Sequence, residues 1–234
     1  MHIPKTAGTS FRLFLRRATE AQEGICLPEI NDNYLDYGAF LRESTAIAAS
    51  YDLIYGHFPY HVSKLLPPVN TVVTVLRDPL ERCISHIKHQ IQVSQESEDQ
   101  GETMTDINDF IESPDLQNRI FLQTLRNLTV KYLSCCGDPN EIYSDADLSL
   151  LEAAKNCQKI LFGFADELED FQKKLADELF PEVIVECMAL RENFSSDSFT
   201  VKDLTARNRA FLEDLNLLDL HLYERLKYGK TYTG

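Results

Sequence analysis

The sequence is short of positive charge. Its 234 residues include 23 lysines and arginines against 37 aspartates and glutamates, which gives a formal net charge of −14. A general nucleic-acid-binding protein usually carries a basic face, so this balance argues against nucleic acid as a partner. It also disfavours a strongly polyanionic acceptor. An anionic small molecule remains compatible with it, because a few local cations are enough to hold one.

Long apolar runs are missing as well. The longest runs fall far short of the roughly 18 consecutive apolar residues that span a bilayer. Lys5 and the Gly/Thr/Ser turn after it stand where the apolar stretch of a signal peptide would be. We therefore expect no membrane segment in this chain.

The six cysteines form no pattern typical of a metal site or a redox motif. They include no CxxC pair and no zinc-like spacing with histidine. Most stand beside apolar residues, which favours buried free thiols in a reducing compartment. We expect no metal site. The cysteines are Cys26, Cys83, Cys135, Cys136, Cys157 and Cys187.

The remaining composition is that of a globular domain. Apolar residues make up 44%, enough for a sizeable core, and no Pro/Gly/Ser-rich linker divides the chain, so residues 1–234 are expected to form one domain. Alternating strands and helices favour an α/β fold with a mostly parallel sheet. Strands are expected over 52–58, 71–76, 160–164 and 183–188, and an exposed acidic loop over 94–106. Helices are expected over 10–18, 79–91, 115–134, 147–158 and 168–179, with one long or broken helical region over 204–226.

The opening stretch, HIPKTAGTSF over residues 2–11, has the composition of an anion-binding turn. It is expected to run from a very short strand through a turn over 4–8 into a helix capped by Ser10. A helix N-terminus offers unpaired N–H groups and a positive dipole end to a phosphate. Lys5 adds a charge, although the order differs from a Walker A loop because Lys5 precedes Gly8. The expected cradle consists of Lys5, Thr6, Ala7, Gly8, Thr9 and Ser10. The alternative is an ordinary loop with a capped helix and a solvated lysine.

A second strand–loop–helix unit follows the strand over 71–76. Arg77 stands at the strand end, and Asp78 with Pro79 suits the cap and first position of a helix. The local alternative for Arg77 is an ordinary helix start with an ion pair. Arg82 is predicted to be either a phosphate contact or a surface charge, while His86, on the polar side of this helix, is expected to be solvated.

In this order, HIPKTAGTSF and VLRDPLERCISH resemble the motifs of the PAPS-dependent sulfotransferase superfamily, where PAPS is 3′-phosphoadenosine 5′-phosphosulfate. The closest likeness is to its carbohydrate (2-O-type) branch and bacterial relatives. NLTVKYL, ILFGFADELEDFQKKL and NLLDLHLYERLKYG resemble further family segments. The resemblance implies a P-loop-NTPase-like three-layer fold with a central parallel sheet flanked by helices. It also implies that the first motif binds the 5′-phosphosulfate, and that Arg77 and Ser85 bind the 3′-phosphate.

The implied reaction moves a sulfuryl group from PAPS to an acceptor hydroxyl, without a metal. Lys5 is expected to stabilise the charge that grows on the leaving oxygen. His57, at the end of the strand in YGHF, is our candidate general base because its ordinary pKa suits proton transfer near neutral pH. The resemblance agrees, since carbohydrate members place a catalytic histidine in a Gly-His pair. A structural role for His57, or an acidic base elsewhere, stays open. His61 and Lys131 are candidate acceptor contacts.

The expected acceptor is a carbohydrate or a small alcohol, and the product nucleotide is 3′-phosphoadenosine 5′-phosphate. Two alternatives remain: a P-loop-like nucleotide phosphotransferase, for which Asp78 or Asp166 would have to hold Mg²⁺, and a non-catalytic nucleotide-binding protein of the same fold. Family members carry a full strand before the first motif, so the first strand is expected to be truncated here. A cytoplasmic location is expected if the chain is complete, and the Golgi lumen if it is a trimmed form of an anchored enzyme. The sequence does not predict the oligomeric state.

Overall fold

A computed structural model describes residues 1–20, 55–64, 71–96, 106–113, 116, 119–134, 149–181 and 199–229. At its centre two short strands, β1 (Val73–Leu76) and β2 (Leu161–Phe164), pair in parallel. Val73 stands opposite Leu161, and Leu76 opposite Phe164. β1 forms where the sequence VTVL supplies β-branched residues, as expected from the run over 71–76.

The first residues of the chain lie along the other side of β1. The Met1 amino group donates to the Val73 carbonyl at 3.2 Å, and the His2 amide donates to the Gly56 carbonyl at 2.9 Å. Residues 1–2 therefore lie between β1 and the Tyr55–Gly56 segment, as a short central strand would. In the described part of the predicted strand over 52–58, only Tyr55 has strand-like pairing, and the chain bends at Gly56 and His57.

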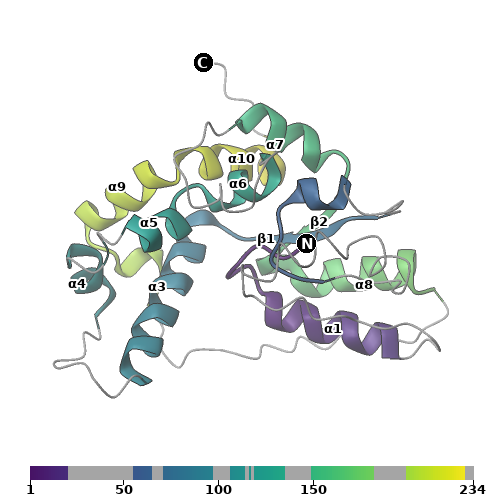
Figure 1. Cartoon of the computed structure of the whole chain (residues 1–234), viewed down its shortest axis with the longest axis horizontal. Helices are drawn as coiled ribbons and strands as arrows, with labels where there is room; N and C mark the ends of the chain where they lie inside the picture. The colour runs from purple at the N-terminus through teal and green to yellow at the C-terminus, as the bar shows by residue number, and fades with distance from the viewer. Residues whose placement is uncertain are drawn as a thin grey trace.

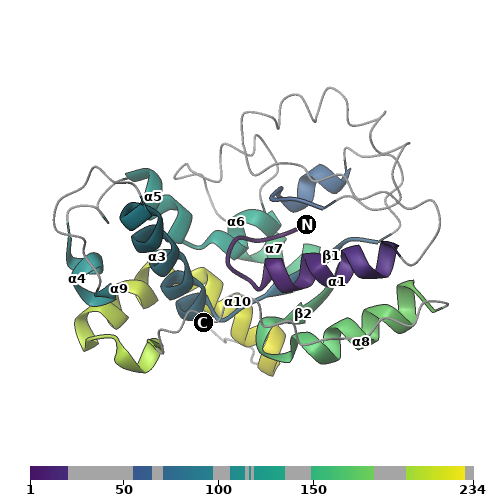
Figure 2. The ribbon, with the colours of Figure 1, turned by 90° about the horizontal axis from the view of Figure 1, so that it is seen from below.

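Two helices cover one face of the strands. α1 (Gly8–Glu20) and α8 (Leu168–Leu179) pack against each other and against Val75, and they lie side by side in both views (Figures 1 and 2). Close packing explains Gly163 in β2, because a Cβ there would lie 2.1 Å from the ring of Phe171. No side chain larger than hydrogen fits at that position without displacing α8.

Three other helices cover the opposite face. α6 (Leu128–Ser134), α7 (Leu150–Cys157) and α10 (Leu217–Tyr228) surround a core that includes Leu76 of β1 and the half-buried Phe162 and Phe164 of β2. In Figure 1 these helices lie above the strands, and α1 and α8 lie below them. Successive side chains of β1 and β2 point to opposite faces and pack into the two cores. Both faces of these strands are therefore largely apolar.

A third core lies beyond the end of β1. It is built by α3 (Pro79–Glu96), α4 (Ile107–Glu112), α5 (Arg119–Leu125) and α9 (Ala206–Leu215), with Cys83, Ile84 and Ile87 of α3 fully buried. Figure 2 shows these helices grouped at one side of the molecule. Short 3₁₀ turns complete the described elements: η2 (Tyr60–Lys64), η4 (Ala165–Glu167) and η5 (Val201–Asp203).

The α6 and α10 N-termini cap each other. Asn127 Oδ1 accepts from the amides of Leu218 and Asp219 at 3.0 and 3.2 Å, and the Asp219 carboxylate accepts from Thr129 and Val130 at 2.9 and 2.8 Å. Each helix start thereby satisfies free N–H groups of the other. The sequence predicted helical segments over 115–134 and one long or broken helical region over 204–226. Both regions are broken in the structure, at 126–127 and at Asn216, and Asn127 at the first break caps α10.

Other boundaries also differ from expectation. α1 begins at Gly8, so Ser10 lies inside the helix and is not its cap, and α3 continues to Glu96, into the region predicted as a loop. The predicted strand over 183–188 lies outside the described residues. Cys83 and Cys157 are buried free thiols, as expected, and burial raises the pKa of Cys157 to about 12. The other four cysteines also lie outside the described residues.

Taken together, the described residues form a mostly helical structure around a small parallel sheet, consistent with an α/β class. Among the helices described, none has both the length and the apolar character needed to cross a membrane.

Candidate functional site

The turn over 4–7 has an unusual backbone. Lys5 has φ of 67° and Ala7 has φ of 65°, while Thr6 between them has a negative φ. In the described residues only one other non-glycine residue, Asn127, has a positive φ. Alternating positive and negative φ is the pattern of an anion-binding nest, in which successive N–H groups point toward one ligand, so the Lys5–Ala7 turn is a candidate nest. A non-glycine residue in this region costs about 1–2 kcal/mol, so the turn concentrates strain at one place.

Side chains around the turn hold it in shape. The Thr6 hydroxyl is fully buried and donates to the Ile3 carbonyl at 2.8 Å, so its proton is already used within the turn. The Phe11 amide donates to the Ala7 carbonyl at 3.1 Å, which starts α1 directly after the turn. Thr9 is exposed and Ser10 is buried. Among the predicted hydroxyl donors, Thr9 is therefore the one that faces solvent.

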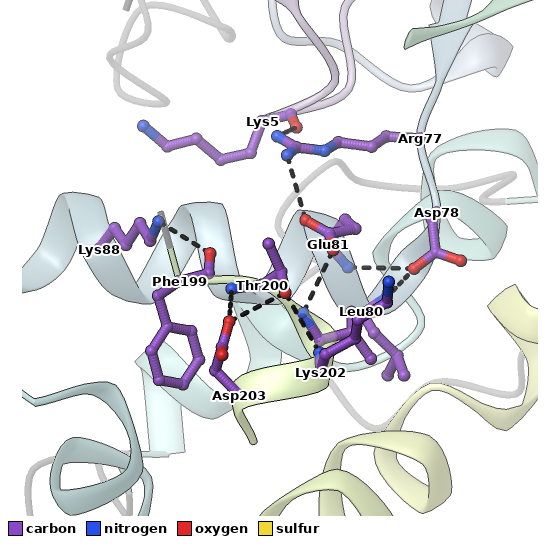
Figure 3. Close-up of polar contacts among 11 residues, drawn as sticks. Lys5, Arg77, Asp78, Leu80, Glu81, Lys88, Phe199, Thr200, Lys202 and Asp203 are labelled. Atoms are coloured by element: carbon purple, nitrogen blue, oxygen red, sulfur yellow. Dashed lines mark hydrogen bonds and ion pairs between the residues drawn. The ribbon is translucent and has the colours of Figure 1, made fainter. Parts of the chain in front are cut away.

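Arg77 reaches the turn from the end of β1. Its Nη1 donates to the Lys5 carbonyl at 3.4 Å, and its Nη2 lies 3.6 Å from the Glu81 carboxylate (Figure 3). Burial lowers the pKa of the Arg77 guanidinium, and the nearby Glu81 and Asp78 carboxylates oppose that shift. Figure 3 shows the Lys5 side chain extending away from this contact. Lys5 and Arg77 are thus two cationic residues joined at this turn.

The start of α3 follows the sequence prediction. Asp78 Oδ1 accepts from the Leu80 and Glu81 amides at 3.0 and 3.1 Å, and Pro79 occupies the first helical position. Ser85 lies one turn after Glu81 and therefore on the same helix face. Since Glu81 pairs with Arg77, the half-buried Ser85 lies on the side of α3 that faces Arg77.

A segment that the sequence analysis did not single out lies against the same part of α3. The Val201 amide donates to Glu81 Oε1 at 3.3 Å, and Lys88 Nζ donates to the Phe199 carbonyl at 3.1 Å (Figure 3). Glu81 therefore contacts both Arg77 and this segment. A local signal for the turn exists, because Thr200 and Asp203 form a capping box at the start of η5. Its contact with α3 has no local signal.

His57 is oriented by the opening segment. Its Nδ1 lies 3.0 Å from the His2 carbonyl oxygen. A carbonyl oxygen can only accept, so Nδ1 carries the proton in this contact, and in a neutral ring Nε2 is then the basic nitrogen. Hydrogen bonding at Nδ1 is how a histidine base is commonly held in its working tautomer. The structure thus joins His57 to the first residues of the turn.

His86 was expected to be solvated, and this expectation is wrong. Its ring makes an edge contact with Phe121, 5.5 Å between centroids, and its Nε2 lies 3.5 Å from Thr124 Oγ1, because α5 covers this side of α3. Burial lowers the pKa of His86 to about 3, with smaller contributions from Arg82, Lys5 and His57. His86 is therefore a neutral group within electrostatic reach of the site.

Three other candidates are buried away from solvent. Arg82 is fully buried and donates to the carbonyls of Leu125 and Thr124, so it is neither a surface charge nor an exposed phosphate contact. Lys131 is 2% exposed and its ammonium donates to the side chain and carbonyl of Gln123 at 2.8 and 3.0 Å, which favours a structural role. His61 is buried in η2.

Comparisons with known proteins add no assignment. No family model matches the chain, and no curated protein is significantly similar to it.

Proposed function

We propose that this chain is a sulfotransferase of the P-loop-like, three-layer type, which moves the sulfuryl group of PAPS to an acceptor hydroxyl on a carbohydrate or a small alcohol. One observation carries the proposal: a nest of alternating backbone handedness over Lys5–Ala7 opens directly into α1 and is tied to Arg77 at the end of β1. Strained backbone at a helix start, beside a half-buried arginine, supports a site for phosphate groups.

The residues present fit a nucleotide with two separate phosphate positions. The nest and Lys5 would hold the 5′-phosphosulfate, because they combine N–H groups with a mobile charge. Arg77 and Ser85 would hold the 3′-phosphate, as the motif resemblance implies, because Arg77 follows β1 and Ser85 shares a face of α3 with Glu81, the partner of Arg77. When bound, PAPS supplies an activated sulfuryl group.

The chain's own residues would supply the rest of the chemistry. Lys5 and the first N–H groups of α1 stabilise the negative charge that develops on the leaving oxygen, which favours the transition state over the ground state. His57 accepts the proton of the acceptor hydroxyl at Nε2, because Nδ1 is engaged with the His2 carbonyl. Removing a group that stabilises such charge typically reduces the rate about a hundredfold or more.

The two aspartates that a phosphotransferase would need are already engaged. Asp78 caps α3, and Asp166 forms an ion pair with Lys227. This arrangement favours the sulfotransferase over the phosphotransferase.

Thermal unfolding with 3′-phosphoadenosine 5′-phosphate, or with ADP and Mg²⁺, tests the proposal. At a hundred times its dissociation constant, a ligand adds about 2.7 kcal/mol to stability. We expect a shift with the bisphosphate that Lys5→Ala weakens. Lys173→Ala, which removes an equal charge from an exposed ion pair on α8, should leave that shift unchanged. A shift with ADP and Mg²⁺ alone would overturn the proposal.

A further inference from the structure

His2 stands at a junction that neither the sequence motif nor the proposed reaction explains. Its backbone is used twice, since its amide donates to Gly56 O at 2.9 Å and its carbonyl accepts from His57 Nδ1. Its ring is used as well. The centroids of the His2 and His57 rings are 4.2 Å apart with a 30° tilt, and the Tyr55 ring stacks at 5.5 Å. His2 therefore packs along the segment that carries the candidate base.

The His2 ring also packs against the turn that is proposed to bind phosphate, at Gly8. A Cβ at Gly8 would lie 1.8 Å from His2 Nε2 and 1.9 Å from Cε1. Gly8 does not have a positive φ, so its backbone would accept alanine, and the obstacle is the His2 ring itself. The ring cannot swing away easily because Tyr55 and His57 flank it. Gly8 is thus explained by contact with His2, whereas the sequence had placed it in the expected anion cradle.

A second link joins the same two segments. The Tyr55 hydroxyl donates to the Gly8 carbonyl at 3.0 Å, and both groups are buried. This bond fixes the first residue of α1 against the 55–57 segment. The His2 ring fills the space between them.

The charge state of His2 suits a packing role. Burial lowers the pKa of His2 well below its ordinary value, and positive charge on His57, the amino terminus, Lys5 and Arg12 lowers it further. The ring is therefore neutral at physiological pH. A neutral ring can stack on His57 without opposing the positive charge that His57 gains when it accepts a proton.

We propose that His2 is a positioning residue that holds the phosphate turn and His57 in one fixed relative arrangement. One edge of its imidazole sets the position of Gly8 and the start of α1, and its face sets the orientation of the His57 ring. The consequence for binding and transfer rests on the function proposed above, but the packing relationship does not.

Four forms of the full chain test this inference: wild type, His2→Ala, Gly8→Ala and the double variant. Thermal unfolding gives the coupling between the two positions. We expect Gly8→Ala to lower the melting temperature, and His2→Ala to remove most of that additional loss in the double variant, because the clash is gone. Equal losses from Gly8→Ala in both backgrounds would overturn the proposal.

The orientation of His57 needs its own readout. Proton–nitrogen correlation spectra of the imidazoles report which ring nitrogen is protonated. We expect the Nδ1-protonated form of His57 in the wild type, and a mixed population in His2→Ala, because the unsupported ring can rotate. An unchanged His57 spectrum in His2→Ala would overturn the positioning role. If His2→Ala does not fold, His2→Leu, which fills volume without a flat ring, gives the same readout.

Calorimetric titration with 3′-phosphoadenosine 5′-phosphate separates this inference from the proposed function. We expect Gly8→Ala to weaken binding about tenfold and the double variant to regain most of that affinity. If the wild type does not bind but the stability coupling and the His57 spectrum behave as expected, the proposed function fails and the positioning role of His2 stands. If the wild type binds the nucleotide and no coupling is found, the proposed function stands and the positioning role of His2 fails.

Discussion

The guanidinium of Arg77 donates to the backbone carbonyl of Lys5, and the two residues are 72 positions apart in the sequence. This bond turns the Lys5 carbonyl toward β1, on the side of the turn where Arg77 lies. Arg77 therefore has two functions in the proposed site. It holds the shape of the turn, and it presents its remaining donors to a ligand.

Replacing Arg77 should affect a 3′-phosphate more than the rest of a nucleotide. Arg77→Ala is expected to reduce the affinity for 3′-phosphoadenosine 5′-phosphate about tenfold or more, because a charge-assisted hydrogen bond is lost. The affinity for adenosine 5′-phosphate, which lacks the 3′-phosphate, should fall less, since Arg77 contributes to its binding only by supporting the turn. Calorimetric titration of both nucleotides gives the two ratios. Equal losses would show that Arg77 acts only through the turn.

Removing the Glu81 charge should strengthen anion binding. Glu81 lies 3.6 Å from Arg77 and competes with a ligand phosphate for the guanidinium. In Glu81→Gln the amide oxygen can still accept from Val201, so the contact between α3 and η5 is kept. We expect roughly two- to fivefold tighter binding of 3′-phosphoadenosine 5′-phosphate at low salt, and less in high salt.

The control for this change is Glu169→Gln on α8. It neutralises an exposed carboxylate paired with Lys173, and so changes the net charge by the same amount. Its effect on binding should be negligible. A similar gain in both variants would indicate that overall charge, rather than the Arg77–Glu81 pair, limits affinity.

The reciprocal caps predict a separable effect at Asn127. Asn127→Gly keeps a residue that tolerates the observed φ of 46° but leaves two amides, one buried and one partly buried, without their acceptor, which should cost about 1–3 kcal/mol. Asn127→Ala adds the penalty of a positive φ and should be about 1 kcal/mol less stable than the glycine variant. Urea unfolding curves measure both. If the two variants are equally stable, backbone strain does not contribute at this position.

Features set by neighbouring residues could be predicted from the sequence. β1 follows from a β-branched run, the start of α3 from Asp78 and Pro79, and the helical character of α1 from its apolar spacing. The position of Arg77 could be predicted for the same reason, because it follows from the end of a strand and the start of a helix next to it. These signals lie within a few residues of the feature that they specify.

Features set by distant partners could not be predicted. The break at Asn127 depends on an acceptor role toward α10, some 90 residues later in the chain. Arg82 and His86 look like the polar side of an isolated helix, yet α5 covers both of them. The role of Glu81 depends on Val201, which no local pattern connects to α3. Helical spacing tells which residues share a face, but it does not tell what packs on that face.

Burial of His86 predicts a pH dependence of stability. Its pKa is about 3 in the folded chain against an ordinary value of 6.5, so between these values the unfolded chain binds more protons. Stability from this group is therefore full above pH 6.5 and falls as the pH is lowered toward 3, by up to about 1.4 kcal/mol per pH unit. In His86→Phe the free energy of unfolding, measured with urea, should fall less steeply between pH 6.5 and 4.

His89→Gln, at an exposed position of the same helix, serves as the control and should stay much closer to the wild type, because burial, not His89, is the main cause of the lowered His86 pKa. Burial raises the pKa of Asp219, which contributes with the opposite sign, so the difference between variants isolates His86. Parallel curves for wild type and His86→Phe would show that His86 is protonated in the folded chain, and that α5 does not seal this face of α3.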